Sequence, residues 1–431
     1  MTTCVDVRAL GGAALGLWLA LGTACSSSDP GEGAGGQFAG GSVGTTGGQG
    51  SAGGAQAGSS PGGAAPGGQA GAGQGGSGSG AGAGGGNAAG GGGAAGGSPQ
   101  GGGAGASTEP AIHYVGRVDV SNPESARLAW SGSGAVVRFR GTALSVELGG
   151  GQEYTVVIDG EVQTKLTAVN GANPLATGLA AGDHTVELYR RTEAAEGESQ
   201  ILGFDWGDGE LLAPPPVSRR LEFVGDSITC GYGVEGANMS CGFSPETENH
   251  YLTYAALAAR SLNAELSTVA WSGKGVVCNY GDDATSCVDP LPKFYDLTLP
   301  SQPGSSWDFS RFQPDAVVVN LGTNDFSTQV DPDQATFEGA YRALLVRLRQ
   351  VYPSAHILCT NGPMLSGADL STLRGYLTNV VAAMADPKIS TFQITPQDGS
   401  DGYGCDWHPS AARHQKVALD VEAALRDALG W

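Results

Sequence analysis

The architecture of this chain can be read from the run Leu221-Glu222-Phe223-Val224-Gly225-Asp226-Ser227, a short apolar strand followed at once by a polar turn. Further short apolar strands are expected at Thr268-Val269-Ala270-Trp271, Ala316-Val317-Val318-Val319-Asn320 and His356-Ile357-Leu358-Cys359. Amphipathic segments alternate with these strands, at about 249–262, 334–351, 369–385 and 411–428. Alternating strands and helices predict an α/β fold in which a parallel sheet is covered by helices on both faces.

The region before these strands has a different spacing of apolar residues. Between about residues 111 and 212 apolar side chains recur at every second position, as in Tyr154, Val156 and Ile158. This alternation is typical of strands with one buried face, and it predicts a small antiparallel β-sandwich of the jelly-roll type. Asp159-Gly160 has the composition of a hairpin turn, and Gly182-Asp183 is interpreted as another. We therefore assign residues 110–213 to a β-sandwich domain and 217–431 to the α/β domain, joined by the stiff connector Ala213-Pro214-Pro215-Pro216.

The first quarter of the chain is expected to lie outside both domains. Residues 1–25 have the basic start, apolar run and small residues of an export signal, and Ala24-Cys25 resembles a bacterial lipoprotein cleavage site. Cys25 would then carry the lipid; the alternative is plain secretion with Cys25 discarded or free. Residues 26–109 are almost entirely Gly, Ala, Ser and Gln, which predicts a disordered linker spanning roughly 50 Å. We expect an exported bacterial protein, either a cell-surface or outer-membrane lipoprotein or a secreted one.

The charge of the chain limits its possible binding partners, and its cysteine content predicts disulfide bonds. The formal net charge of −20 argues against nucleic acid and against anionic lipid, so a membrane is expected to be reached only through an anchor at Cys25. Without Cys4 and Cys25, six of the eight cysteines remain, and one to three disulfides are expected in an exported chain. Three pairings are considered: Cys278 with Cys287, Cys230 with Cys241, and Cys359 with Cys405. Six cysteines allow fifteen connectivities, and the sequence does not choose among them.

Polar clusters follow the expected strands in a fixed order. Gly225-Asp226-Ser227 follows the first strand, Ser272-Gly273-Lys274-Gly275 the second and Gly322-Thr323-Asn324-Asp325 the third, while His408 precedes the last helix. In parallel sheets functional groups gather beyond the carboxyl ends of the strands. A serine hydroxyl becomes a nucleophile when a histidine accepts its proton and an acceptor orients that histidine. The order predicts a serine esterase in which Ser227, His408 and Asp406 take these three roles.

These blocks resemble the SGNH (GDSL-type) hydrolases and, more narrowly, the two-domain carbohydrate esterase family 2. The wider family is marked by a Ser, a Gly, an Asn and a His, which here fall on Ser227, Gly273, Asn324 and His408. The narrower resemblance covers residues about 111–431 and rests on four longer runs: Phe223 to Gly233, Ala270 to Gly275, Asn320 to Phe326 and Cys405 to Ser410.

The resemblance implies an SGNH-type parallel sheet behind an N-terminal β-domain. It also implies an oxyanion hole made of the Ser227 and Gly273 backbone N–H groups and the Asn324 side-chain amide, with Gly275 the less favoured claimant for the glycine role. The implied activity is removal of O-acetyl groups from xylan and other plant polysaccharides through a serine acyl-enzyme. No cofactor and no metal are implied.

One departure concerns the acid. The wider family usually places it three residues before the histidine, where this chain has Cys405, whereas Asp406 is only two before. Family 2 enzymes include both Ser-His-Asp triads and Ser-His dyads in which a backbone carbonyl orients the histidine. Asp406 is taken as the third member, with the dyad as the alternative.

The neighbouring residues have simpler interpretations. Asp226 and Asp325 are expected to fix loops through backbone N–H groups. Cys405-x-x-His408 imitates half of a zinc site, but no second Cys/His pair accompanies it in the sequence. Trp271, Trp407 and Tyr232 are assigned to carbohydrate contact, with packing in the core as their alternative.

Two rival functions stay open. The same site could serve another ester class, such as that of an arylesterase or lipase, or the protein could be a non-catalytic glycan-binding module. We expect a monomer acting on an acetylated polysaccharide or oligosaccharide. The sequence does not name the polysaccharide or the hydroxyl that is deacetylated.

Overall fold

A computed structural model describes residues 111–431 except 283–285 and 328–330. The expected export signal (1–25), its lipidation site Cys25 and the expected linker (26–109) lie outside the described residues. Among the described residues, no helix is long and apolar enough to cross a bilayer.

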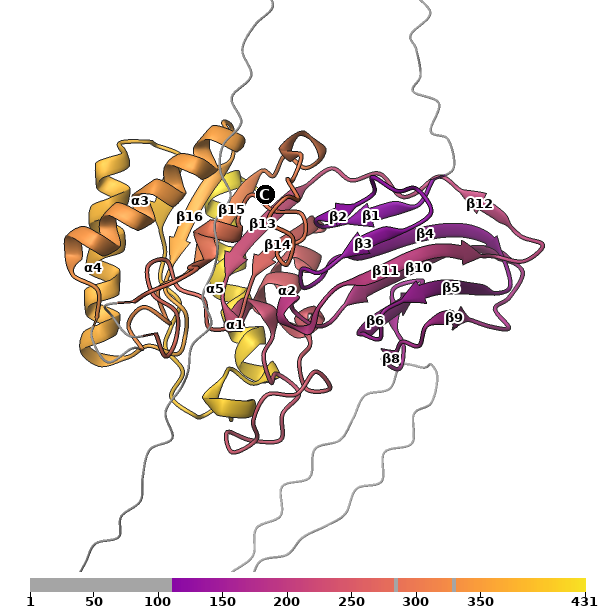
Figure 1. The fold of residues 1–431 in the computed structure, drawn as a ribbon, viewed down its shortest axis with the longest axis horizontal. Helices are drawn as coiled ribbons and strands as arrows, with labels where there is room; N and C mark the ends of the chain where they lie inside the picture. The colour runs from indigo at the N-terminus through magenta and orange to yellow at the C-terminus, as the bar shows by residue number, and fades with distance from the viewer. Residues whose placement is uncertain (1–110, 283–285, 328–330) are drawn as a thin grey trace, which may run out of the picture. The chain divides into compact units, whose positions relative to one another are not determined.

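The N-terminal region consists of two antiparallel sheets around a shared apolar core (Figure 1). The first sheet has the order β1-β4-β10-β6-β7, with β12 beside β4 and β8 beside β6; the second has the order β2-β3-β11-β5-β9. The strands are β1 (His113–Val115), β2 (Val118–Asp119), β3 (Ala126–Leu128), β4 (Gly134–Gly141), β5 (Leu144–Gly149), β6 (Glu153–Ile158), β7 (Glu161–Val162), β8 (Leu166–Thr167), β9 (Gly171–Ala176), β10 (Gly182–Arg190), β11 (Ser199–Asp205) and β12 (Glu210–Leu212).

The period-two pattern in the sequence corresponds to the buried faces of these sheets. Val137 and Phe139 of β4 and Val146 of β5 are buried in the shared core. Asp159-Gly160 forms the predicted hairpin between β6 and β7, with φ of 50° and 86° as a two-residue turn of this kind requires. The turn predicted at Gly182-Asp183 is wrong: both residues pair with β4 inside β10, and the preceding strand β9 belongs to the other sheet.

The C-terminal region is built on a five-stranded parallel sheet of order β14-β13-β15-β16-β17. The four strands predicted from the sequence are present, and a short fifth strand at the edge was not predicted because only its first residue is buried. The bounds are β13 (Arg220–Gly225), β14 (Glu265–Ala270), β15 (Ala316–Asn320), β16 (His356–Thr360) and β17 (Ile389–Thr391). The helices are α1 (Ser227–Cys230), α2 (Tyr254–Ser261), α3 (Gln334–Val351), α4 (Gly367–Met384) and α5 (Ala411–Leu429).

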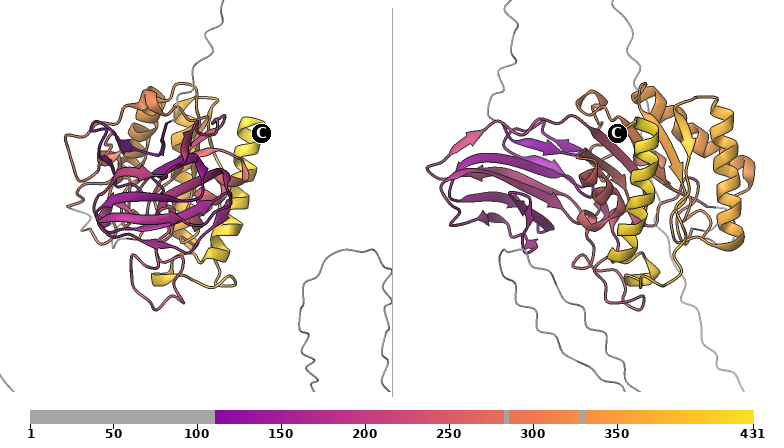
Figure 2. Two further views of the ribbon diagram at one scale, coloured as in Figure 1. Left: turned by 90° about the vertical axis from the view of Figure 1, so that its right-hand side faces the viewer. Right: turned by 180° about the vertical axis from the view of Figure 1, so that it is seen from behind.

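Alternate residues of the central strands face opposite layers of helices. In β15, Val317 and Val319 pack into the cluster that contains α3 and α4, whereas Ala316 and Val318 pack into the cluster that contains α2 and α5. Figures 1 and 2 show these two helical layers on either side of the sheet. A strand buried on both faces explains the continuous apolar run in the sequence.

A buried ion pair joins the β-sandwich to the parallel sheet. Arg117, between β1 and β2, donates to Glu222 of β13 at 3.3 Å, and both side chains are 0% exposed. The Glu222 carboxylate also accepts hydrogen bonds from Tyr295 at 2.6 Å, Tyr352 at 3.0 Å and Ser267 at 3.2 Å. The buried Glu222 carboxylate is tolerated because these four donors satisfy it, so the pair fixes how the sandwich contacts the sheet.

Removing one partner of this pair should destabilise the protein strongly. We expect Arg117→Ala to lower the free energy of unfolding by about 3–5 kcal/mol, because the Glu222 carboxylate would stay buried without its cation. Arg140→Ala is the matched control: its partners Asp183 and Glu210 are exposed, and its cost should stay below about 1 kcal/mol. Chemical denaturation followed by tryptophan fluorescence measures both, and equal costs would contradict the role given to the buried pair.

Candidate active site

Ser227 lies at the carboxyl end of the central strand β13. The strand ends at Gly225, where a Cβ would meet Thr229 Oγ1 at 2.0 Å, so only glycine allows the chain to turn so closely. Asp226 caps the short helix α1 by accepting a hydrogen bond from Ile228 N at 3.0 Å. This turn presents Ser227 as the first residue of α1, with 7% of the residue exposed.

His408 reaches Ser227 from the other end of the sequence. Its Nε2 lies 2.8 Å from Ser227 Oγ, which is hydrogen-bonding distance. The Tyr232 ring stacks on the imidazole, with centroids 4.0 Å apart and planes inclined by 22°. Burial lowers the pKa of His408 to about 4, although its backbone acceptors act in the opposite direction. The imidazole is therefore neutral near pH 7 and can accept a proton.

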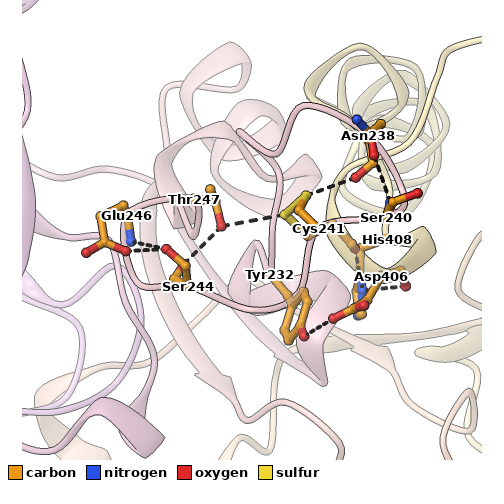
Figure 3. The surroundings of a disulfide bond; sticks show 10 residues. Tyr232, Asn238, Ser240, Cys241, Ser244, Glu246, Thr247, Asp406 and His408 are labelled. Carbon is orange, nitrogen blue, oxygen red and sulfur yellow. Dashed lines mark hydrogen bonds between the residues drawn. A yellow bond between two sulfur atoms is a disulfide. The ribbon is translucent and has the colours of Figure 1, made fainter.

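The acceptors at the other ring nitrogen of His408 belong to the main chain. The carbonyl oxygens of Cys405 and Asp406 lie 3.1 Å and 3.2 Å from His408 Nδ1. The Asp406 carboxylate instead accepts a hydrogen bond from the Tyr232 hydroxyl at 2.5 Å (Figure 3). Asp406 has a φ of +49° and Trp407 a φ of +65°. This backbone conformation directs the carbonyl oxygen of Asp406 to His408 Nδ1 and its carboxylate to the Tyr232 hydroxyl. The sequence analysis assigned the Asp406 carboxylate to orient His408. In the structure Asp406 contacts His408 through its backbone carbonyl oxygen instead.

A cysteine pair anchors the loop that carries His408. Cys241 and Cys405 lie at disulfide distance with their Cα atoms 4.7 Å apart, and Asp406 N donates to Cys241 O at 2.9 Å (Figure 3). Cys405 therefore offers no free thiolate to the zinc half-site that its spacing from His408 imitates.

Of the three pairings considered from the sequence, the structure brings only Cys278 and Cys287 together, with Cα atoms 4.8 Å apart. The pairings of Cys230 with Cys241 and of Cys359 with Cys405 are wrong. Cys230 and Cys359 are buried and unpaired, one in α1 and the other in β16 facing the α3 and α4 cluster.

The loops after β14 and β15 bring the predicted oxyanion donors to the same edge of the sheet. Gly273, with a φ of +76°, follows β14, and Asn324 follows β15. Asn324 Nδ2 donates to Lys274 O at 2.9 Å, which ties the two loops together. The N–H of Gly275 is directed to Asn279 Oδ1 at 3.4 Å, and a Cβ on Gly275 would meet Cys278 O at 2.0 Å. Between the two glycines, the geometry favours Gly273 as the donor.

The two buried aspartates fix loops, as their sequence context indicates. Asp325 accepts hydrogen bonds from the N–H groups of Val276, Val277 and Cys278 at 2.7–3.0 Å, which shapes the loop after Gly273. Burial raises the pKa of Asp325 above its usual range and that of Asp226 to about 7.

The aromatic side chains of the loops around the site differ in exposure and contacts. Trp407 is 55% exposed beside His408, whereas Tyr232 supports the imidazole and Trp271 packs on Phe294 with centroids 4.9 Å apart. The sequence analysis did not single out Tyr280, which is 69% exposed and whose N–H donates to Gly273 O at 2.8 Å. A lone tyrosine in a loop carries no sequence signal that would have identified it.

A second group missed from the sequence is Glu193, a buried residue between β10 and β11 of the sandwich. Its carboxylate accepts a hydrogen bond from Ser272 N at 2.5 Å, next to Gly273. Nothing in the sequence links two residues 79 positions apart in different domains.

Two family descriptions cover most of the described chain. Residues 114–216 match "Carbohydrate esterase 2 N-terminal", and residues 223–416 match "GDSL-like Lipase/Acylhydrolase family". Among curated proteins, the chain is 45% identical over 330 residues to "Cellulase/esterase CelE" of Acetivibrio thermocellus, with 75% of this chain but only 40% of that protein covered. It is 28% identical to an "Acetylxylan esterase / glucomannan deacetylase" of Cellvibrio japonicus, with 76% of this chain and 91% of the relative covered.

The solved structures give the same result for the fold. A family two carbohydrate esterase from Clostridium thermocellum, in complex with cellohexaose, matches with a TM-score of 0.70 and 44% identity. The match covers 74% of this chain and 100% of that one. The sandwich and the parallel sheet are thus shared with a relative of 44% identity over its whole length, and the chain belongs to carbohydrate esterase family 2.

Proposed function

We propose that the protein is an exported carbohydrate esterase that removes O-acetyl groups from plant polysaccharides such as xylan or glucomannan. The observation that carries the proposal is the 2.8 Å contact between Ser227 Oγ and His408 Nε2 at the open edge of the sheet. The substrate class follows from family membership and from the names of the Cellvibrio relatives. Because the chain spans only 40% of the Acetivibrio relative, its cellulase activity is not carried over.

The site residues suit an acyl-enzyme reaction. Ser227 Oγ attacks the acetyl carbonyl carbon while His408 Nε2 takes the hydroxyl proton. The negative charge that develops on the carbonyl oxygen is stabilised by the N–H groups of Ser227 and Gly273 and by the Asn324 amide. His408 then gives this proton to the departing sugar oxygen, which leaves as a hydroxyl, and the acetyl group stays on Ser227. Water, deprotonated by His408, next attacks the acetyl-serine. His408 returns the proton to Ser227 Oγ as the bond to the acetyl carbon breaks, and acetate is released.

The exposed aromatic ring of Trp407 suits stacking on a sugar face. We assign it to substrate contact, whereas Tyr232 and Trp271 act by supporting His408 and the loop after β14. We propose further that the protein is exported, is a monomer and is anchored by a lipid at Cys25. Its proposed partner is an acetylated polysaccharide, and nucleic acid is not expected to bind. The two cysteine pairs at disulfide distance are consistent with an oxidising compartment.

Acetate release tests the reaction. Purified protein incubated with acetylated xylan or glucomannan should release acetate, and Ser227→Ala should reduce turnover by at least about 10⁴-fold because the nucleophile is gone. Binding of the polymer should survive this substitution. Release of acetate only from small aryl or lipid esters would favour the other ester class. Polymer binding without acetate release by the parent protein would favour a glycan-binding module.

The orientation of His408 can be tested at Asp406. We expect Asp406→Asn to keep turnover within about tenfold, since the Cys405 and Asp406 carbonyls stay on Nδ1 and asparagine tolerates the positive φ. Loss of a required triad carboxylate costs about 10⁴-fold in the best-studied serine protease. A loss of that size in kcat, with the fold intact by circular dichroism, would instead put the carboxylate on the imidazole during turnover.

The pH profile reports on the same base. His408 must be neutral to accept the proton, and its pKa is lowered to about 4, so kcat/KM should be constant from about pH 6 to 8. Below about pH 4 it should fall roughly tenfold per pH unit as His408 is protonated. Asp226→Asn is the control, because burial raises the pKa of Asp226 to about 7 and any step near that pH should vanish in this variant. A midpoint near 6.5 that persists in Asp226→Asn would contradict the assignment.

A further inference from the structure

The β-sandwich contributes one carboxyl side chain to the catalytic edge of the parallel sheet. Glu193 lies in the connection between β10 and β11 and is 2% exposed. Its Oε2 accepts a hydrogen bond from Ser272 N at 2.5 Å. The same oxygen lies 3.5 Å from Sγ of Cys230, the last residue of the helix that begins at Ser227. One carboxyl oxygen therefore contacts both segments that supply backbone oxyanion donors.

The connection that carries Glu193 is itself held firmly. The buried Arg190 guanidinium donates to three carbonyl oxygens of this turn: Thr192 at 2.9 Å, Glu193 at 2.8 Å and Gly197 at 2.7 Å. Glu193 N donates to Glu248 Oε2 at 3.2 Å, which attaches the turn to the α/β domain. With its main chain bound on both sides, the Glu193 side chain is presented at a fixed place.

The surroundings of the Glu193 carboxyl group favour its neutral form. Burial raises the pKa of Glu193 and of the neighbouring Glu248 above their usual range. A neutral carboxyl group still accepts a hydrogen bond through its carbonyl oxygen. It also places less negative charge near the oxygen on which charge develops during the reaction.

The Ser272-Gly273 peptide, which carries the Gly273 N–H, is the middle of a turn closed by Lys274 N, which donates to Trp271 O at 3.2 Å. The loop after this peptide is held by Tyr280 N on Gly273 O and by Asn324 on Lys274 O. Glu193 holds Ser272 N, which comes before this peptide. Oxyanion donors are effective only when they are held in place before charge develops.

We propose that Glu193 is a positioning residue that orients the Ser272-Gly273 peptide, so that the β-sandwich domain completes the oxyanion hole of the neighbouring domain. This inference rests on the proposed esterase function. Glu193 touches neither substrate nor the reacting atoms, and it acts through Ser272 N.

Two substitutions at Glu193 and one control separate positioning from general stability. Glu193→Ala removes the acceptor and should lower kcat by about 10–100-fold with little change in KM, by analogy with the loss of the hydrogen-bond partner behind a metal ligand. Glu193→Gln keeps an oxygen that can accept from Ser272 N and should retain kcat within about threefold. Glu198→Ala is the matched control, because Glu198 lies in the same connection and contacts Ser301 and Gln302 of the α/β domain away from this loop. Its kcat should stay within about twofold of the parent.

The assay uses the whole purified protein with p-nitrophenyl acetate, well below the unfolding temperature of each variant. If Glu193→Ala does not fold, Glu193→Asp gives the same comparison, since the shorter side chain cannot hold the 2.5 Å contact and should still lower kcat relative to Gln. Equal kcat in the Glu193 variants and the parent, or an equal loss in Glu198→Ala, would overturn the inference. A parent protein inactive on every ester would instead overturn the proposed function.

Discussion

Parallel pairing of β13 with β14 and β15 is the constraint on which the site depends. Gly225 is level with Ala270 on one side and with Asn320 on the other, so the three strands end together. Each chain leaves the sheet at the same edge, and residues two to four positions further on must meet there. This register brings Ser227, Gly273 and Asn324 together although almost a hundred residues separate the first from the last.

The parallel sheet and the edge that holds the site could be predicted from the sequence because both depend on local patterns of residues. Continuous apolar runs predict the strands, and the polar clusters that follow each run in the sequence predict the edge of the sheet where they meet. Side-chain direction is a different matter. The spacing in the sequence places Asp406 near His408 but does not say which of its groups faces the imidazole. Its positive φ turns the carboxylate toward Tyr232 and directs the backbone carbonyl oxygen to His408 Nδ1. Cys241 and Cys405 are 164 residues apart, and no periodicity encodes such a pairing.

Orientation of His408 by carbonyl oxygens has an electrostatic consequence. A carboxylate on Nδ1 would stabilise the imidazolium and raise the pKa of the histidine, whereas carbonyl dipoles stabilise it less. With burial dominant, the base has a low pKa and is neutral across a wide range of pH. The cost is a smaller driving force for taking the serine proton. Donors at the oxyanion must then supply a larger share of the stabilisation of the transition state.

That requirement gives the β-sandwich a role beyond scaffolding. The sandwich is joined to the sheet through the buried Arg117–Glu222 pair at the middle of β13, and through Glu193 it reaches the loop beyond β14. The first contact makes separation of the domains costly, and the second uses their fixed relation to hold a peptide beside the nucleophile. Glu193 crosses the domain interface next to the loop that carries Gly273, so the rigidity of the interface is passed on to that loop. On this view the two domains form one catalytic unit, and loosening their interface should impair the oxyanion loop before it unfolds either domain.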